Sequence, residues 1–177
     1  SGFNAAVKVV RSIASSAALF LPSSGVAGAP LLLSATALDS GGEPASSTAV
    51  FSLSSASTSG AFSQDNGYSW ASTTTVAMTS GAFSLLYRDT KTGTSTVLAS
   101  SSLGSPSKST SIVAAAAARV SGTASPVAVF NNAVDGPNTS TLSIWVVDDW
   151  GNPVVGASVG LTVAAGGGNL SLLTALT

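Results

Sequence analysis

Residues 142–161 read LSIWVVDDWGNPVVGASVGL, and this segment decides the fold. An alternating apolar segment is followed by Asp148, a Gly-Asn-Pro turn and a second alternating segment. Alternation places successive side chains on opposite faces of a β-strand. Gly151 and Asn152 tolerate left-handed backbone angles, and Pro153 cannot donate a ladder hydrogen bond. The segment therefore predicts two β-strands separated by a tight turn.

The same pattern occurs twice in the chain, about 109 residues apart. Residues 37–44, ALDSGGEP, return as residues 146–153, VVDDWGNP. Upstream, residues 13–20, IASSAALF, return as residues 123–130, TASPVAVF. Repetition at this length is typical of tandem domains and not of a short-period solenoid. A tandem array favours a modular protein over an enzyme, which needs one unique constellation of residues.

The repeat also predicts the domain organisation. We expect one domain over residues 1–115 and the first half of a second over residues 116–177, joined by an extended linker around residues 114–120. The second copy has no counterpart to about residues 70–113. Two explanations stay open: the chain is a fragment of a longer array, or strands of a neighbouring subunit complete the second domain, with residues 1–10 as the natural donor.

Short alternating segments separated by clusters of Gly, Ser, Asn, Asp and Pro recur along the chain, which is typical of an all-β sandwich. In each segment one of the two alternating sets should face the core, for example either Leu33, Ala35 and Ala37 or Ser34, Thr36 and Leu38. The expected strands lie near residues 6–13, 17–21, 30–38, 48–54, 72–78, 82–88, 94–100, 109–115, 126–130, 140–147 and 157–163.

The surface implied by the composition carries very little charge. Charged residues make up 7% of the chain, the net charge is −1, and 52 of 177 residues are Ser or Thr. An ordinary soluble domain has about 25% charged residues. Such a surface offers little repulsion between molecules, so it suits a chain packed against copies of itself, coated in glycans, or both.

Composition also excludes several function classes. Cysteine and histidine are both absent, so a disulfide, a thiolate nucleophile and a His general base are unavailable. Six Lys and Arg residues, scattered singly, form no stripe for nucleic acid. No apolar run approaches the roughly 18 to 20 residues that span a bilayer. We expect no cofactor, no nucleic-acid partner and no membrane span.

With these motifs, most of the chain resembles the bacterial immunoglobulin-like repeats of invasin- and intimin-type adhesins, which are related in pattern to filamin repeats. Residues 142–161 carry the strand, Asp, Gly-Asn-Pro turn and strand of that pattern. Residues 82–97, AFSLLYRDTKTGTSTV, match its aromatic strand and Gly-Thr hairpin. The first copy departs at the turn, where residues 41–44 read GGEP. The resemblance implies tandem immunoglobulin-like β-sandwiches, and fold alone does not specify an activity.

The acidic residues are expected to be structural. Asp39 and Asp148 can accept hydrogen bonds from backbone N–H groups across their turns. Asp148 and its neighbour Asp149 point apart in a strand, and no Asp-x-Asp-x-Asp loop gathers ligands for calcium. We therefore expect no metal site and no paired-carboxylate enzyme.

Aromatic residues are the candidates for contacts. If Leu142 and its alternating partners face the core, then Trp145 and Val147 face outward, near Trp150 at the turn. An outward aromatic is an interface anchor, a platform for sugar, or a residue covered by the neighbouring domain. Tyr68 and Trp70 are expected in a loop that caps one end of the first sandwich.

Asn138 and Asn169 begin Asn-x-Ser/Thr sequences and are possible glycosylation sites. Together these features predict an extracellular structural protein: a repeat module of a surface filament, adhesin stalk or surface layer that associates with copies of itself. The alternatives are a carbohydrate-binding accessory module of a secreted enzyme, which would expose coplanar aromatics over a shallow groove, and a viral tail or capsid decoration domain.

Overall fold

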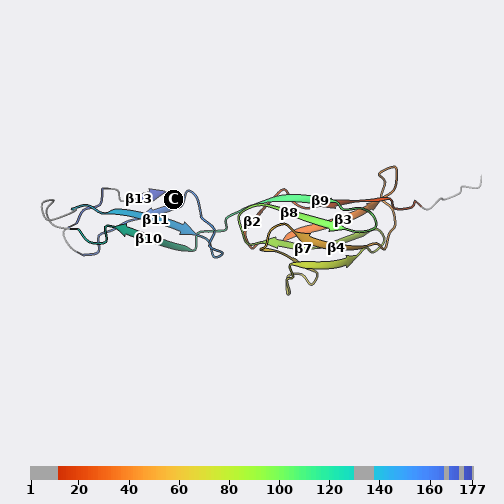
Figure 1. Cartoon of the computed structure of the whole chain (residues 1–177), viewed down its shortest axis with the longest axis horizontal. Coiled ribbons are helices and arrows are strands. Elements are labelled where there is room, and N and C mark those ends of the chain that lie inside the picture. Colours follow the sequence, from red (N-terminus) through yellow and green to blue (C-terminus); the bar gives the residue numbers. More distant parts are fainter. Residues whose placement is uncertain (1–11, 130–137, 166–167, 172–173, 177) are drawn as a thin grey trace, which may run out of the picture. The chain divides into compact units, whose positions relative to one another are not determined.

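The computed structural model describes residues 12–129, 138–165, 168–171 and 174–176, and every regular element in them is a β-strand. The chain divides into two compact units, Ser1–Ile112 and Val113–Thr177, called unit 1 and unit 2 below. Figure 1 shows their strands. The all-β prediction is confirmed, and the predicted domain limits, 1–115 and 116–177, stay a prediction.

Unit 1 is a sandwich of two antiparallel sheets, as expected for an immunoglobulin-like fold. Because the strand sequences alternate, each sheet presents one apolar face to the opposite sheet. The four-stranded sheet has the order β1 (Ser16–Phe20), β3 (Leu31–Leu38), β7 (Ala82–Asp89) and β5 (Gly60–Ser63). The five-stranded sheet has the order β2 (Ser24–Val26), β9 (Ser107–Val113), β8 (Gly93–Ser100), β4 (Val50–Ser55) and β6 (Thr73–Ala77).

The core of unit 1 lies between the two sheets and follows the predicted alternation. Leu33, Ala35 and Ala37 of β3 are buried, while the intervening residues point outward. Phe51 of β4 meets Phe83 of β7 across the core, with ring centroids 5.4 Å apart in a tilted arrangement. Such tilted pairs add to the free energy gained from burial.

Unit 2 contains two pairs of strands in its described residues. β10 (Arg119–Ser125) pairs antiparallel with β11 (Thr141–Val147), and β12 (Ser158–Gly160) pairs antiparallel with β13 (Thr174–Leu176). Where the structure describes burial in unit 2, the buried side chains are Val146, Asp148 and Asn152. The repeated turn therefore lies at the best-packed part of this unit.

One predicted strand of the second copy is wrong. The described part of residues 126–130 contains no strand, and the partner of β11 is instead β10, which begins at Arg119 and shortens the predicted linker to residues 114–118. Pro126 explains the difference, because a proline cannot donate a ladder hydrogen bond and ends the strand at Ser125.

Two further differences concern strands of unit 1. The short strands β2 and β5 were not expected, since each is too short to show an alternating pattern. The predicted strand at residues 6–13 falls largely on residues 1–11, which lie outside the described residues, as does the proposed donor segment 1–10. The other expected strands of unit 1 are present as β1, β3, β4 and β6 to β9.

Candidate functional site

A carboxylate organises the turn that follows β3. Asp39 Oδ1 accepts the backbone N–H of Gly41 at 2.8 Å and of Glu43 at 3.0 Å. Gly42 N–H donates to the Asp39 carbonyl at 3.1 Å, and Asp39 N–H donates to the Glu43 carbonyl at 2.9 Å. The hydroxyl of Ser12 donates to Oδ2. Gly42 has a φ of 83°, in the left-handed region that favours glycine.

The turn after β11 repeats this arrangement. Asp148 Oδ1 accepts the N–H of Trp150 at 2.9 Å and of Asn152 at 2.8 Å. Gly151, also with a φ of 83°, donates its N–H to the Asp148 carbonyl at 3.1 Å. Asp148 Oδ2 accepts the N–H of Ala115 at 3.0 Å and the side-chain amide of Asn152 at 2.8 Å. Pro153 follows and forms an isolated bridge with Val147.

These bonds set the pKa of both carboxyls. The hydroxyl of Ser12, followed by the backbone N–H groups of the turn, holds the pKa of Asp39 below its usual value. Burial opposes the ionisation of Asp148, but the hydrogen bonds from Asn152 and the backbone outweigh burial, so the pKa of Asp148 is also lowered. An ionised carboxylate that already accepts these bonds is poorly suited to remove a substrate proton.

A third carboxylate lies in a cluster of hydroxyls that the sequence analysis did not single out. Asp89, at the end of β7, is only 1% exposed. Its Oδ1 accepts the hydroxyl of Ser59 at 2.7 Å and the N–H of Lys91 at 3.0 Å. The hydroxyl of Tyr87 donates to Asp89 Oδ2 at 3.3 Å and lies 2.5 Å from the hydroxyl oxygen of Ser95. Asp89 thereby ties β7 to the loop after β4.

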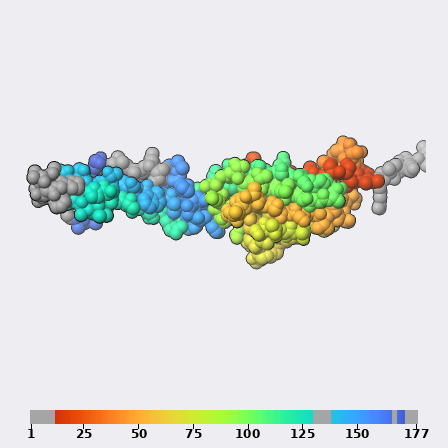
Figure 2. All heavy atoms as spheres, viewed as in Figure 1, coloured from red at the N-terminus to blue at the C-terminus, as the bar shows by residue number. Residues whose placement is uncertain are grey.

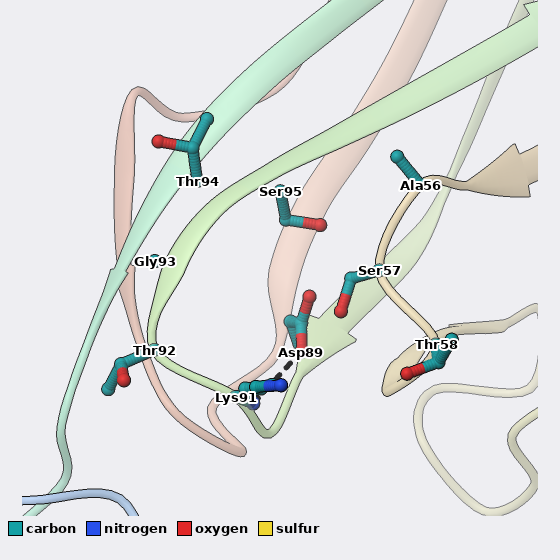
Figure 3. A pocket seen from close by; sticks show the side chains of 9 residues that line it. All are labelled: Ala56, Ser57, Thr58, Asp89, Lys91, Thr92, Gly93, Thr94 and Ser95. Atoms are coloured by element: carbon teal, nitrogen blue, oxygen red, sulfur yellow. Dashed lines mark hydrogen bonds between the residues drawn. The ribbon is translucent and has the colours of Figure 1, made fainter.

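This cluster lies beside a polar cavity of about 400 Å³. Figure 3 shows the oxygens of Ser57, Ser95 and Asp89 pointing toward one another, with the Asp89–Lys91 hydrogen bond dashed. Burial opposes the ionisation of Asp89, yet the hydrogen bonds, led by the Lys91 N–H, lower its pKa. The cavity is lined by Ala56, Ser57, Thr58, Asp89, Lys91, Thr92, Gly93, Thr94 and Ser95.

A tightly bonded loop carries the exposed tyrosine of unit 1. Asp65 accepts the hydroxyl of Ser63 at 2.6 Å and both the N–H and the hydroxyl of Ser69, at 2.9 and 2.6 Å. Gly67 N–H donates to Ser63 Oγ at 2.8 Å. Tyr68 is 92% exposed on this loop, residues 64–72, which stands out from the sandwich in yellow in Figures 1 and 2.

Trp70 is held at the base of the same loop. Its Nε1–H donates to the Gly67 carbonyl at 3.0 Å, and the Arg88 guanidinium carbon lies 4.2 Å from the ring centroid. Arg88 therefore covers one face of the Trp70 ring in a cation–π contact. A sugar could not stack on that face without displacing the arginine, so Tyr68 and Trp70 do not form a two-ring platform with both faces free.

The other contact candidates belong to unit 2. Trp145 and Val147 occupy alternate positions of β11, where Trp145 is 45% exposed and Val147 is half-buried. Trp150, in the Asp148 turn, is 49% exposed. Their contact roles stay a prediction. Asn138 and Asn169 are both exposed, which a glycosylation site requires, and their glycosylation stays a prediction as well.

Two further findings concern the described residues only. No group of three or more Asp, Glu, His or Cys side chains is placed to hold a metal ion there. Nor does that part of the chain contain a helix long and apolar enough to cross a membrane.

Comparison with known proteins gives no family. No family model matches the chain, and no curated protein matches it. Among solved structures it is similar to InvD of Yersinia pseudotuberculosis, with a TM-score of 0.49 and 14% identity over 82% of this chain and 44% of that one. Domains 4–9 of the surface layer protein SbsC give a TM-score of 0.44 and 15% identity over 86% and 24%.

A β-glycosidase from Bacteroides vulgatus gives a TM-score of 0.46 and 16% identity over 56% of this chain and 14% of that one. The chain thus spans less than half the length of each of these three proteins. At TM-scores below 0.5, the likenesses give no basis for transferring a function.

Proposed function

We propose that this protein is a structural repeat module of an extracellular or cell-surface assembly, without catalytic activity, which associates with copies of itself. The observation that carries the proposal is the recurrence of one hydrogen-bonded turn in both units. Each backbone bond at Asp39 has a counterpart at Asp148, 109 positions later. Repeated units with the same turn are the basis of modular arrays.

The acidic side chains support a structural role. Asp39, Asp65, Asp89 and Asp148 each accept at least three hydrogen bonds from nearby N–H or O–H groups. All four have lowered pKa values. In this reading the chain uses these four of its seven acidic residues to fix turns and strand ends.

The outer face of the five-stranded sheet supports self-association. A shallow hollow of about 580 Å³ on this side of unit 1 has no charged residue in its lining. Hydroxyls of neighbouring strands lie side by side there, as in the pairing of Ser52 with Thr75 and with Ser100. Uncharged surfaces of this kind lack the like-charge repulsion that keeps proteins apart. The lining comprises Ser52, Leu53, Ser54, Thr73, Thr74, Thr75 and Ser100.

Sedimentation velocity of the unglycosylated 177-residue chain at micromolar concentration tests the proposal. We expect concentration-dependent oligomers at both low and high salt, since association does not depend on ion pairs. A monomer at every salt and protein concentration would contradict self-association. Binding of a soluble oligosaccharide by that monomer would favour a carbohydrate-binding module instead.

A further inference from the structure

The exposed loop of unit 1, residues 64–72, contains an Asn-Gly pair in a tight turn. Asn66 has a φ of 58° and Gly67 a φ of 92°, and the N–H of Tyr68 donates to the Asp65 carbonyl at 3.5 Å. Two consecutive positive φ values of this size are those of a type I′ turn, for which asparagine followed by glycine is a favoured pair. Asn66 is exposed, so water reaches its side-chain amide.

Asparagine is a thermolabile residue because its side-chain amide reacts with the backbone that follows it. In that reaction the Gly67 nitrogen attacks Cγ of Asn66. A new N–Cγ bond replaces the Cγ–Nδ2 bond, and the Gly67 N–H proton leaves with the amide group as ammonia. The resulting succinimide adds water at either of its carbonyls and opens to aspartate or to isoaspartate. Glycine favours the attack, since it has no Cβ to hinder the approach of its nitrogen.

The folded turn keeps the two reacting groups apart. The succinimide ring closes only when the Gly67 nitrogen and Cβ of Asn66 lie on the same side of the Asn66 Cα–C bond. In a type I′ turn the first central residue has a ψ of about +30°, which places the following nitrogen nearly opposite Cβ. The reaction therefore requires rotation about the Asn66 Cα–C bond, and this rotation moves the Gly67 N–H out of its place in the turn.

Ser63 holds that N–H in its place. The Ser63 Oγ accepts the Gly67 N–H at 2.8 Å and donates its own proton to Asp65 Oδ1 at 2.6 Å. Ser63 is the last residue of β5 and is only 2% exposed, so the sandwich fixes the position of its hydroxyl. The Gly67 carbonyl accepts the Nε1–H of Trp70 at 3.0 Å. Gly67 is thus held at both its N–H and its C=O group.

We propose that Asn66 is a modification site, which converts to aspartate or isoaspartate only when the hydrogen bond between Gly67 and Ser63 opens. Ser63 is then a positioning residue that keeps the Asn-Gly pair unreactive in the folded loop. The product adds a negative charge beside Asp65, in a chain whose net charge is −1. Isoaspartate also lengthens the backbone by a methylene group, so the turn cannot close again with its original hydrogen bonds. The inference does not depend on the proposed self-association.

Peptide mass spectrometry of the full chain after incubation at mildly alkaline pH measures the conversion, because a carboxyl group is heavier than an amide. The reference is the same chain unfolded in guanidinium chloride, where the turn is not held. We expect Asn66 to convert at least about tenfold more slowly in the folded chain, since the reactive conformation is reached there only by local opening. This comparison needs no variant.

Ser63→Ala tests the role of the hydroxyl that holds the Gly67 N–H. We expect this variant, while folded, to convert Asn66 at least about threefold faster than the original chain, because the loop opens more often. Ser84→Ala is the matched control, since it removes an exposed hydroxyl of β7 outside the loop. Hydrogen exchange at the Gly67 N–H is the second readout. Exchange and conversion pass through the same opening, so Ser63→Ala should raise both rates by a similar factor.

Three results would overturn the proposal. Equal rates of conversion in the folded and the unfolded chain would show that the loop does not hold the Asn-Gly pair unreactive. Faster exchange at the Gly67 N–H in Ser63→Ala, without faster conversion of Asn66, would show that this hydrogen bond does not control the reaction. A lack of conversion even in the unfolded chain would show that Asn66 is not a modification site.

Discussion

Asp39 and Asp148, 109 positions apart, accept hydrogen bonds from the same two positions of their turns. In each case Oδ1 takes the backbone N–H groups two and four residues later, at 2.8 and 3.0 Å for Asp39 and at 2.9 and 2.8 Å for Asp148. The GGEP and WGNP turns differ in sequence, but both place glycine at the one position with a positive φ. A shared carboxylate and a shared glycine thus preserve the turn.

The two turns differ in burial, which predicts unequal effects of mutation. Asp148 is fully buried, whereas Asp39 is partly exposed. We expect Asp148→Ala to lower the free energy of unfolding of unit 2 by about 2–3 kcal/mol, because buried N–H donors lose their acceptor. Urea denaturation followed by tryptophan fluorescence measures this, since Trp145 and Trp150 report on unit 2 and Trp70 reports on unit 1.

Asp39→Ala is the matched variant and should lower the free energy of unfolding of unit 1 by less, because water can replace the carboxylate at a partly exposed turn. The free energy of unfolding of Asp148→Asn should fall between those of the original chain and Asp148→Ala. The amide oxygen of Asn can still accept a hydrogen bond, but its NH₂ group cannot accept one from the remaining donors. Equal losses for Asp39→Ala and Asp148→Ala would contradict the burial argument.

The lowered pKa values predict how stability depends on pH. Asp39, Asp65, Asp89 and Asp148 all have pKa values below 3.8 in the folded state, so folding favours their ionised forms. This stabilisation is fully present above the unfolded-state pKa of about 4 and is lost as the pH falls through the folded-state values. Urea midpoints should therefore drop steeply below about pH 4.

At higher pH the urea midpoint should not change with pH until the alkaline range is reached. The chain has no histidine to titrate near neutral pH. Burial, with a smaller contribution from Asp89, raises the pKa of Tyr87, so stability is lost when Tyr87 ionises above about pH 10. A marked change in the urea midpoint between about pH 5 and 9 would contradict this assignment of the titrating groups.

One buried hydroxyl can be removed without loss of folding stability. Thr110 Oγ1 is buried without a hydrogen-bond partner, and Thr110 of β9 pairs with Ser95 of the neighbouring strand β8. Thr110→Val keeps the shape and removes the unpaired polar atom, so we expect unit 1 to be unchanged or more stable by about 1 kcal/mol. Thermal unfolding measures the effect. Ser95→Ala is the contrasting variant and should destabilise, since it breaks the 2.5 Å contact with Tyr87.

Substitution of Trp145 should affect association more than folding stability. If it lies in a contact between copies, Trp145→Ala should weaken association by more than about tenfold while changing the melting temperature of the chain little. Phe20→Ala, which removes a 59% exposed aromatic from unit 1, serves as the control. Loss of several kcal/mol of folding stability with unchanged association would show that Trp145 acts as a core residue.

The sequence predicted the fold well where alternation was long. β3, β4 and β7 alternate over several residues, and in each of them one of the two sets that the pattern offered is buried. β5 and β2 were not predicted, because segments of four and three residues are too short to show an alternating pattern. The strand before β11 was predicted at residues 126–130 and lies at β10 instead. The residues of β10, RVSGTAS, alternate weakly and are almost all exposed, so the prediction followed the repeat, which continues past Pro126.

The site was predicted less completely. Asp39 and Asp148 were identifiable because each precedes a glycine-containing turn that ends in proline. Asp65 and Asp89 make comparable hydrogen bonds, but many of their partners are serine hydroxyls. In a chain where nearly a third of residues are Ser or Thr, sequence spacing does not show which hydroxyls meet a carboxylate.

Negative-stain electron microscopy of the unglycosylated 177-residue chain at micromolar concentration tests the central claim most directly. A self-associating structural module predicts ordered assemblies with one recurring contact between copies, present across a wide range of salt concentration. Burial of more than roughly 1,000 Å² at that contact is expected of a stable interface. Single, unassociated particles at every salt concentration would contradict the claim.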